Sequence, residues 1–171
     1  MLNKILVAID ESGSSEWAFD TALAMAKSLQ AELLLAHVLD ASAYDSPKPS
    51  VFLAGSLAQD TESPKQKEYD QEWQQFTDHY ETLLKQKRAE AEAAGVSATH
   101  VQAYGTPDRK LCELARTNNI DLIVVGNRDR TNKNSISSYL VQHAPCSVTV
   151  VHPKASSQST TTVERREAVA V

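Results

Sequence analysis

Two polar segments of the chain carry residue types that suit the binding of an anionic group. The first begins with Asp10, directly after a short apolar run, and continues as the serine-rich turn 11–15. The second also follows an apolar run and extends from Gly126 to Ser135. Unpaired backbone N–H groups at the start of a helix attract anions, and serine hydroxyls add donors. Each segment therefore predicts either an anion site or, on the plainer interpretation, a capped helix start beside a solvated turn.

The second segment has the more informative composition. Gly126 permits a close approach of another backbone, and Ser135 is suited to cap a helix while its hydroxyl bonds a phosphate. Arg128, Arg130 and Lys133 add positive charge between them. By spacing alone, phosphate binding and a solvated polar turn remain equally open.

The elements that must position these segments follow from the apolar runs. Four runs without strict alternation are typical of strands covered on both faces of a parallel sheet, and a fifth alternates more. They span residues 4–9, 32–38, 121–125 and 147–151, with the weaker run at 99–104. Helical patterns separate them, from about 15 to 30, from about 69 to 94, from Pro107 onward, and a short one from 136 to before Pro145. Alternation of strands and helices predicts repeated strand–helix crossovers.

The predicted fold is an α/β domain with an open five-stranded parallel sheet in the order 3-2-1-4-5 and helices on both faces. Parallel strands connect by right-handed crossovers, so the order reverses between strands one and four. Ligands bind in such sheets at the carboxyl ends of the strands, beside this reversal. The segments that start at Asp10, Val38 and Gly126 are therefore expected to meet there.

Features of the predicted helices give further expectations. Thr106 is placed to cap the third helix, with Pro107 at its first position. The aromatic residues on helical stripes are expected in the core, and these are Trp17, Trp73, Phe76 and Tyr80. The histidines show no metal-type spacing, and Cys112 and Cys146 are interpreted as core thiols, so no metal site is predicted.

Domain organisation is predicted from length and composition. The 171 residues fit one domain, placed at 1–154. Residues 41–66 are too long for an ordinary connection, which leaves a functional flap or a mobile loop. Residues 155–171 are rich in Ser and Thr and then charged, and they are expected to be a disordered tail.

Charge and hydropathy limit the classes of partner. A formal net charge of −5 offers no electrostatic footprint for nucleic acid. The apolar runs are shorter than the roughly 20 residues that a membrane span needs. The N-terminus runs straight into a strand pattern, without the features of a signal peptide. The expectation is a cytoplasmic protein that contacts neither nucleic acid nor membrane.

Several segments together resemble the universal stress protein family. They occur in the family's order and are KILVAIDESGSS, LLLAHV, Gly105-Thr106-Pro107, DLIVVG and HAPCSVTVV. The resemblance covers about residues 2–152 and implies the adenine-nucleotide alpha-hydrolase-like fold. It also implies that Asp10 contacts the ribose or metal region, that the Val38 backbone meets adenine, and that Gly126 and Ser135 meet phosphate.

The phosphate loop departs from the pattern of ATP-binding members, Gly-x2-Gly-x9-Gly-Ser/Thr. Gly126 matches the first glycine, but Asp129 stands at the second, and Asn134-Ser135 aligns with the last pair. Ser135 lies nine positions after Gly126, so the loop is five residues shorter than the pattern requires. An aspartate beside a polyphosphate is repulsive, and the lost glycines remove conformations that the cradle needs. The expected ligand is ATP or AMP, bound weakly.

The favoured function is a stress-linked binding or regulatory protein that dimerises through the edge strand Ser147–Val151 and has no catalytic residues of its own. The edge strand lacks the lysines and prolines that usually block edge pairing. An ATP/AMP-binding switch with slow hydrolysis is the alternative. An α/β enzyme acting on a small anion in the same crevice is the third hypothesis.

Overall fold

The computed structural model describes residues 1–49, 64–127 and 135–152, along which strands and helices alternate as the sequence predicted. The strands are β1 (Lys4–Ala8), β2 (Glu32–Leu39), β3 (Ala98–Tyr104), β4 (Leu122–Gly126) and β5 (Ser147–Val151). The helices are α1 (Gly13–Leu29), α3 (Pro64–Ala93), α4 (Pro107–Thr117) and α5 (Ile136–His143). Most boundaries lie within two residues of the predicted ones.

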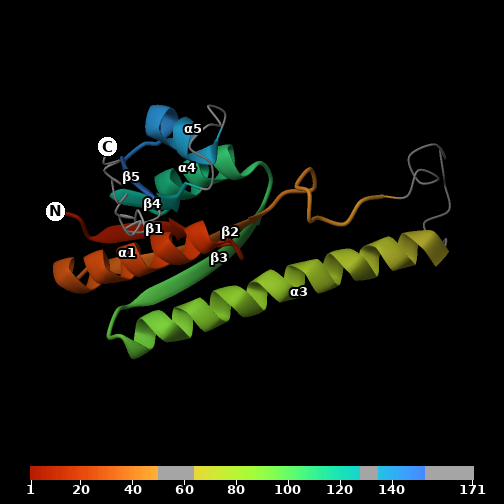
Figure 1. Ribbon diagram of the computed structural model, residues 1–171, viewed down its shortest axis with the longest axis horizontal. Coiled ribbons are helices and arrows are strands. Elements are labelled where there is room, and N and C mark those ends of the chain that lie inside the picture. Colours follow the sequence, from red (N-terminus) through yellow and green to blue (C-terminus); the bar gives the residue numbers. More distant parts are fainter. Residues whose placement is uncertain (50–63, 128–134, 153–171) are drawn as a thin grey trace, which may run out of the picture.

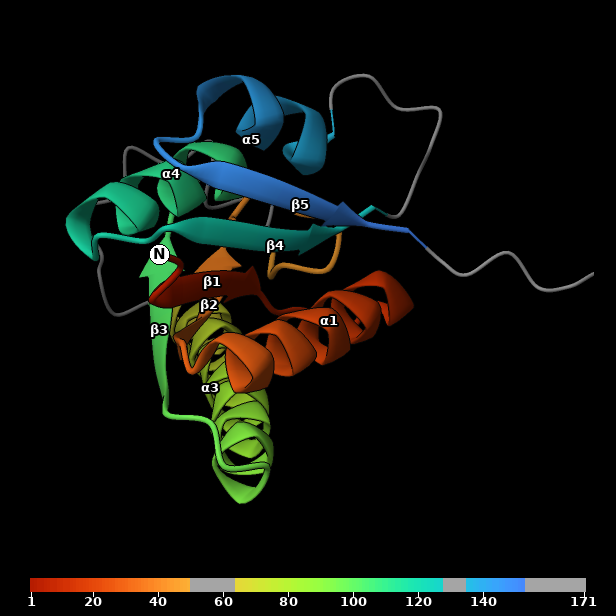
Figure 2. The same ribbon diagram turned by 90° about the vertical axis from the view of Figure 1, so that its left-hand side faces the viewer.

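The five strands form one parallel sheet in the order β3-β2-β1-β4-β5, which confirms the predicted topology. β1 is the central strand, with Val7 paired to Leu35 of β2 on one side and to Val124 of β4 on the other. Figure 2 shows β1, β4 and β5 side by side. The strand order reverses between β1 and β4, so the crevice of this sheet opens beside the end of β1.

Two apolar cores lie on opposite faces of the sheet, and helices cover both (Figure 2). Successive residues of a strand point to opposite faces, and Ile5 and Leu6 accordingly belong to different cores. α1 and α3 contribute the fully buried Phe19 and Leu84 to the first core, and α5 contributes Leu140 to the second. The continuous apolar runs are explained by this burial on both sides.

Local signals account for most helix ends. The Ser12 hydroxyl caps α1 by accepting from the Ser15 N–H at 3.2 Å, and Gln30 ends the helix with a left-handed φ of 56°. Pro107 occupies the first turn of α4, as predicted. Thr106 is the N-cap residue of α4, as predicted, but its side chain makes no capping hydrogen bond.

The long helix α3 begins at Pro64, earlier than the predicted start near Tyr69. Its first turns carry charged and amide side chains without an apolar stripe. Because no face of these turns is buried, the sequence shows no hydrophobic periodicity there. This helix runs well past the sheet at its N-terminal end (Figure 1). The predicted loop 41–66 is therefore helical over its last three residues, while 50–63 lie outside the described part of the chain.

The aromatic residues predicted for the core divide into three groups. Tyr80 is buried, whereas Trp73 and Phe76 are only half-buried. These three rings contact one another edge-on along α3, with centroid separations of 5.5 and 5.1 Å. The prediction for Trp17 is wrong, since 41% of this residue is exposed. The buried face of α1 consists of Phe19 and of small residues such as Ala18, and Trp17 lies outside it.

The predicted tail 155–171 lies outside the described residues, and the domain boundaries stay a prediction. Among the helices that the structure describes, none has the length and apolar character required to cross a bilayer.

Candidate functional site

A cleft of about 660 Å³ opens at the carboxyl ends of the central strands, where the sheet order reverses. All four residues expected to bind a nucleotide line it, namely Asp10, Val38, Gly126 and Ser135. Its volume falls in the range of about 300–1,000 Å³ that is typical of small-molecule sites. The structure therefore brings together residues that lie up to 125 positions apart in the sequence.

The turn between β1 and α1 is held by its own side chains. An Asp10 carboxylate oxygen accepts from the Ser12 N–H at 2.7 Å and from the Ser12 hydroxyl. The Ser15 hydroxyl oxygen in turn accepts from the Asp10 N–H at 2.9 Å. These bonds are those of the plainer sequence interpretation, in which the serines cap a helix. They also fix the Asp10 carboxylate at the edge of the cleft.

Gly126 allows the end of β4 to approach the first turn of α1. A Cβ atom at this position would lie 2.1 Å from the Ser14 carbonyl oxygen and 2.5 Å from its carbonyl carbon. Only a residue without a side chain fits so close to another backbone. The close approach predicted from the sequence is therefore present, and α1 is the element approached.

Ser135 caps α5, as the sequence predicted. Its hydroxyl oxygen accepts from the Ser138 N–H at 3.2 Å and lies 2.9 Å from the Ser137 hydroxyl. The N-termini of α1 and α5 thus both open onto one cleft, each surrounded by serines. Helix N-termini favour negative charge through their unpaired N–H groups and their dipoles.

The charged side chains of the cleft oppose that preference. Asp10, Asp40 and Asp45 line it, and the lining residues within the described ranges include neither Lys nor Arg. The basic residues predicted to assist phosphate binding fall within 128–134, which lie outside those ranges. The helix starts therefore favour an anionic group that these carboxylates oppose, and Asp10 lies at the start of α1 itself.

Val38 lies just beyond the end of the β1–β2 ladder. The last paired residues are Ala8 and Ala36, and the Ile9 N–H donates to the Ala36 carbonyl at 2.8 Å. The next carbonyl, that of Ile9, is bonded at 2.7 Å by Nδ1 of the His37 side chain. Val38 therefore lies beyond the last pair with β1, while it is still paired with Ala103 of β3, and it lines the cleft.

Sequence reasoning missed three residues that form one wall of the cleft, namely His37, Tyr80 and Asp45, named here the His37 wall. The rings of His37 and Tyr80 are stacked, with centroids 3.7 Å apart and planes 9° apart. The Tyr80 hydroxyl donates to Asp45 at 3.0 Å. Helical spacing predicted that Tyr80 points inward, but no sequence signal paired it with His37.

Burial changes the protonation behaviour of both stacked rings. Burial of the imidazole lowers the pKa of His37 below its ordinary value, although the bonded Ile9 carbonyl and nearby carboxylates act in the opposite direction. Burial and, next, the bond to Asp45 raise the pKa of Tyr80 well above its ordinary value. Both rings are therefore neutral at pH 7.

The free energy of unfolding is expected to fall as the pH is lowered below about 6.5, the ordinary pKa of histidine. Because the native pKa of His37 is lower, the unfolded chain binds a proton in this window that the native chain does not. The slope contributed by one such group is at most about 1.4 kcal/mol per pH unit.

Urea unfolding at pH 5.5 and 7.5 measures this loss, with His37→Asn as the comparison because its amide can still donate to the Ile9 carbonyl. The free energy of unfolding of the variant should depend less on pH than that of the wild type. Glu81 and Asp121 also have lowered pKa values, through bonds from His100 and from the Asn3 N–H respectively, but they act below about pH 4.5. Equal slopes for both proteins would contradict the assignment.

An open parallel sheet wound on both faces, with a cleft of nucleotide size at its reversal point, defines a Rossmann-like α/β protein of the nucleotide-binding type. Within that class, the chain belongs to the universal stress protein family, which it matches over residues 1–152. The resemblance noted in the sequence is thereby confirmed.

Relatives of known sequence and structure agree with this membership. A Staphylococcus epidermidis protein assigned to the same family is 32% identical over 155 residues, which cover 86% of this chain and 82% of the relative. The structure of universal stress protein UspA from Lactobacillus plantarum is 27% identical, with a TM-score of 0.65 over 88% of this chain and 97% of that chain.

A more distant structure shows the same fold. It is a universal stress protein family protein from Arabidopsis thaliana, solved with AMP bound. This protein is 19% identical, with a TM-score of 0.59 over 93% of this chain and 97% of that chain.

Proposed function

We propose that this chain is a cytoplasmic stress-response protein that binds an adenine mononucleotide in the cleft and acts by regulation, without turnover of its own. The observation that carries the proposal is the convergence of Asp10, Val38, Gly126 and Ser135 on one cleft of suitable volume. The AMP bound to the Arabidopsis family member supports the choice of ligand. Cell fractionation tests the location.

AMP is the preferred ligand over ATP for two reasons. The loop from Gly126 to Ser135 is five residues shorter than the pattern of ATP-binding members, which leaves fewer backbone donors for a triphosphate. Each added phosphate also brings negative charge toward a cleft lined by Asp10, Asp40 and Asp45. A single phosphate brings less of this charge and can be held at the start of α5.

A thermal-shift series with AMP, cyclic AMP and MgATP tests this ligand preference. At one hundred times its dissociation constant, AMP stabilises the native state by about 2.7 kcal/mol. For a chain of this size that raises Tm by about 5–10 °C. MgATP at the same concentration should raise Tm by no more than about 2 °C if it binds at least one hundredfold more weakly. Equal shifts, or release of phosphate from MgATP, would favour the slow-hydrolysis alternative.

We also propose that the protein forms a homodimer in which the β5 strands of two copies pair. This strand lies at the edge of the sheet. The Val151 carbonyl bonds the Asn127 N–H at 2.9 Å on the inner side, and alternation then turns the backbone groups of Val148 and Val150 outward. These outward groups are available to the same strand of a second copy, related by a two-fold axis.

Replacing Val150 by proline is expected to give a monomer. Proline removes an outward N–H and obstructs pairing, while the ladder to β4 keeps its inner bonds. Light scattering at high micromolar concentration measures the mass, and Val150→Thr is the matched control because it retains the N–H. A monomeric wild type, or a proline variant that remains dimeric, would contradict pairing through β5.

A further inference from the structure

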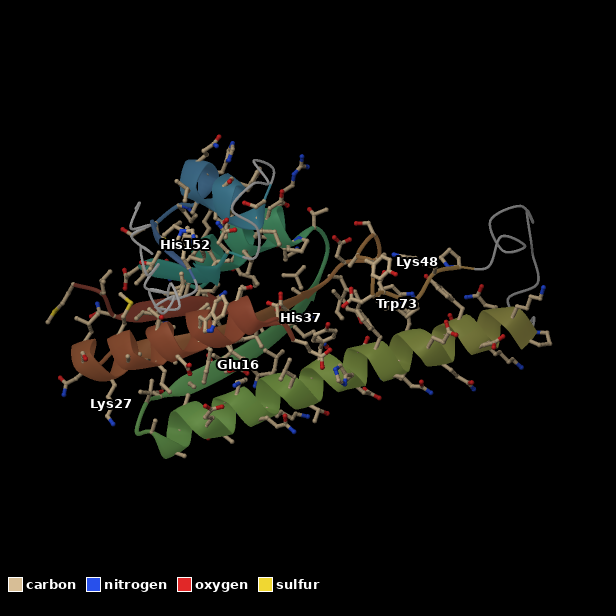
Figure 3. All side chains as sticks on the ribbon, in the orientation of Figure 1. Glu16, Lys27, His37, Lys48, Trp73 and His152 are labelled. Carbon is tan, nitrogen blue, oxygen red and sulfur yellow. The ribbon has the colours of Figure 1, made fainter. Side chains whose placement is uncertain are left out.

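The His37 wall presents hydrogen-bond acceptors to the cleft. His37 lies between the end of the sheet and α3 (Figure 3). Only 8% of this residue is exposed. Its Nδ1 atom is 2.7 Å from the Ile9 carbonyl oxygen. A carbonyl can only accept, so Nδ1 carries the proton, and the neutral ring leaves Nε2 as an acceptor.

The other members of the wall add no donor. The single hydroxyl proton of Tyr80 is used in the bond to Asp45, whose carboxylate can only accept. Tyr80 is 4% exposed and covers one face of the imidazole, which holds the ring orientation. The polar atoms that this wall offers to a ligand are therefore the His37 Nε2 atom and the Asp45 oxygens.

A ligand group that meets such a wall has to be a donor. An amino group donates to Nε2, whereas a carbonyl or phosphate oxygen would place acceptor against acceptor and lose its bond to water. We infer that His37 Nε2 accepts a hydrogen bond from the exocyclic amino group of the nucleotide base. His37 is thus a specificity-determining residue that selects an aminopurine over an oxopurine nucleotide. This inference rests on the proposed function, because it concerns the base of the same ligand.

The expected discrimination is about tenfold. A buried acceptor that loses its partner costs about 1–3 kcal/mol, and 1.4 kcal/mol corresponds to a factor of ten in the dissociation constant. AMP and IMP differ at this position, with an amino group in the first and a carbonyl in the second, so their affinities for the wild type should differ by about this factor.

Isothermal titration of AMP and IMP into the wild type and two variants tests the assignment. His37→Phe keeps a ring beside Tyr80 but removes both nitrogens, and His37→Asn retains a donor for Ile9 while it removes the Nε2 acceptor. Both variants should bind AMP and IMP with nearly equal affinity. A residue that only supports the fold would weaken both ligands alike and leave their ratio unchanged.

His143→Phe is the matched control. His143 also stacks on a tyrosine, Tyr139, at 4.2 Å, and its Nδ1 lies 3.0 Å from the Tyr139 carbonyl oxygen, but it does not line the cleft. Its substitution should preserve the preference for AMP. Failure of the wild type to bind either nucleotide would overturn the proposed function. Binding of AMP with an unchanged AMP/IMP ratio in both His37 variants would overturn the role of His37 alone.

Discussion

Replacing Gly126 by alanine is expected to lower the free energy of unfolding by about 3 kcal/mol. The added methyl group would lie 2.1 Å from the Ser14 carbonyl oxygen, and both elements at this contact are backbone. Neither can move without shifting β4 against the first turn of α1, and overpacking of this kind costs about 1–3 kcal/mol or more. Urea unfolding measures the difference.

Gly13→Ala is the matched control for this substitution. A Cβ atom at Gly13 would meet nothing closer than the Trp17 ring at 4.0 Å. Because the position is helical, alanine should stabilise the chain by about 0.4–1 kcal/mol through the entropy of the unfolded state. A Gly126→Ala variant as stable as the wild type would show that β4 and α1 are not in such close contact.

Lengthening the loop between Gly126 and Ser135 by five residues, with glycines at the pattern positions, is expected to strengthen MgATP binding by two to four decades. Two charge-assisted bonds from added backbone donors contribute about 3–6 kcal/mol together, which gives this range. The native basic residues of the loop replace little of this binding free energy, since an exposed charge pair contributes only about 0–1 kcal/mol.

Isothermal titration with MgATP checks the lengthened loop. An insertion of equal length with alanine in place of the glycines is the control, because it restores the count but not the backbone conformations. The alanine insertion should increase the affinity for MgATP much less than the glycine insertion. Low-micromolar MgATP binding by the wild type would show that the native loop already forms a phosphate cradle by another route.

The sheet and its order were largely predictable because the three inner strands, β1, β2 and β4, are buried on both faces. Runs such as 121–125 contain few polar residues, and right-handed crossovers leave few topologies for five parallel strands. The position of the cleft followed from the same topology. Asp10, Val38 and Gly126 were brought together because each lies at or just after the carboxyl end of a strand, and these ends meet at the same edge of the sheet.

Features that depend on contacts across the chain were not predictable. The start of α3 at Pro64 was not predicted because its first turns have no buried face. Trp17 was expected in the core, yet alanines such as Ala18 occupy the packed stripe of α1. Thr106 has the residue type of a cap without making the bond.

The His37 wall shows the same limit at the site itself. Its three members come from a strand, a helix and a connecting segment, and they meet only through the docking of α3 on the sheet. Propensity and periodicity describe one element at a time, so they predicted that Tyr80 faces inward without pairing it with His37. The preference for a donor group arises from that junction.

A titration of the isotopically labelled protein with AMP, followed by the backbone amide resonances, tests whether the cleft binds an adenine mononucleotide. We expect saturable changes at Asp10, Val38, Gly126 and Ser135, and none at His143, which lies outside the cleft. Resonances that do not change with AMP, or that change mainly away from these four residues, would contradict the assignment of the cleft as an adenine mononucleotide site.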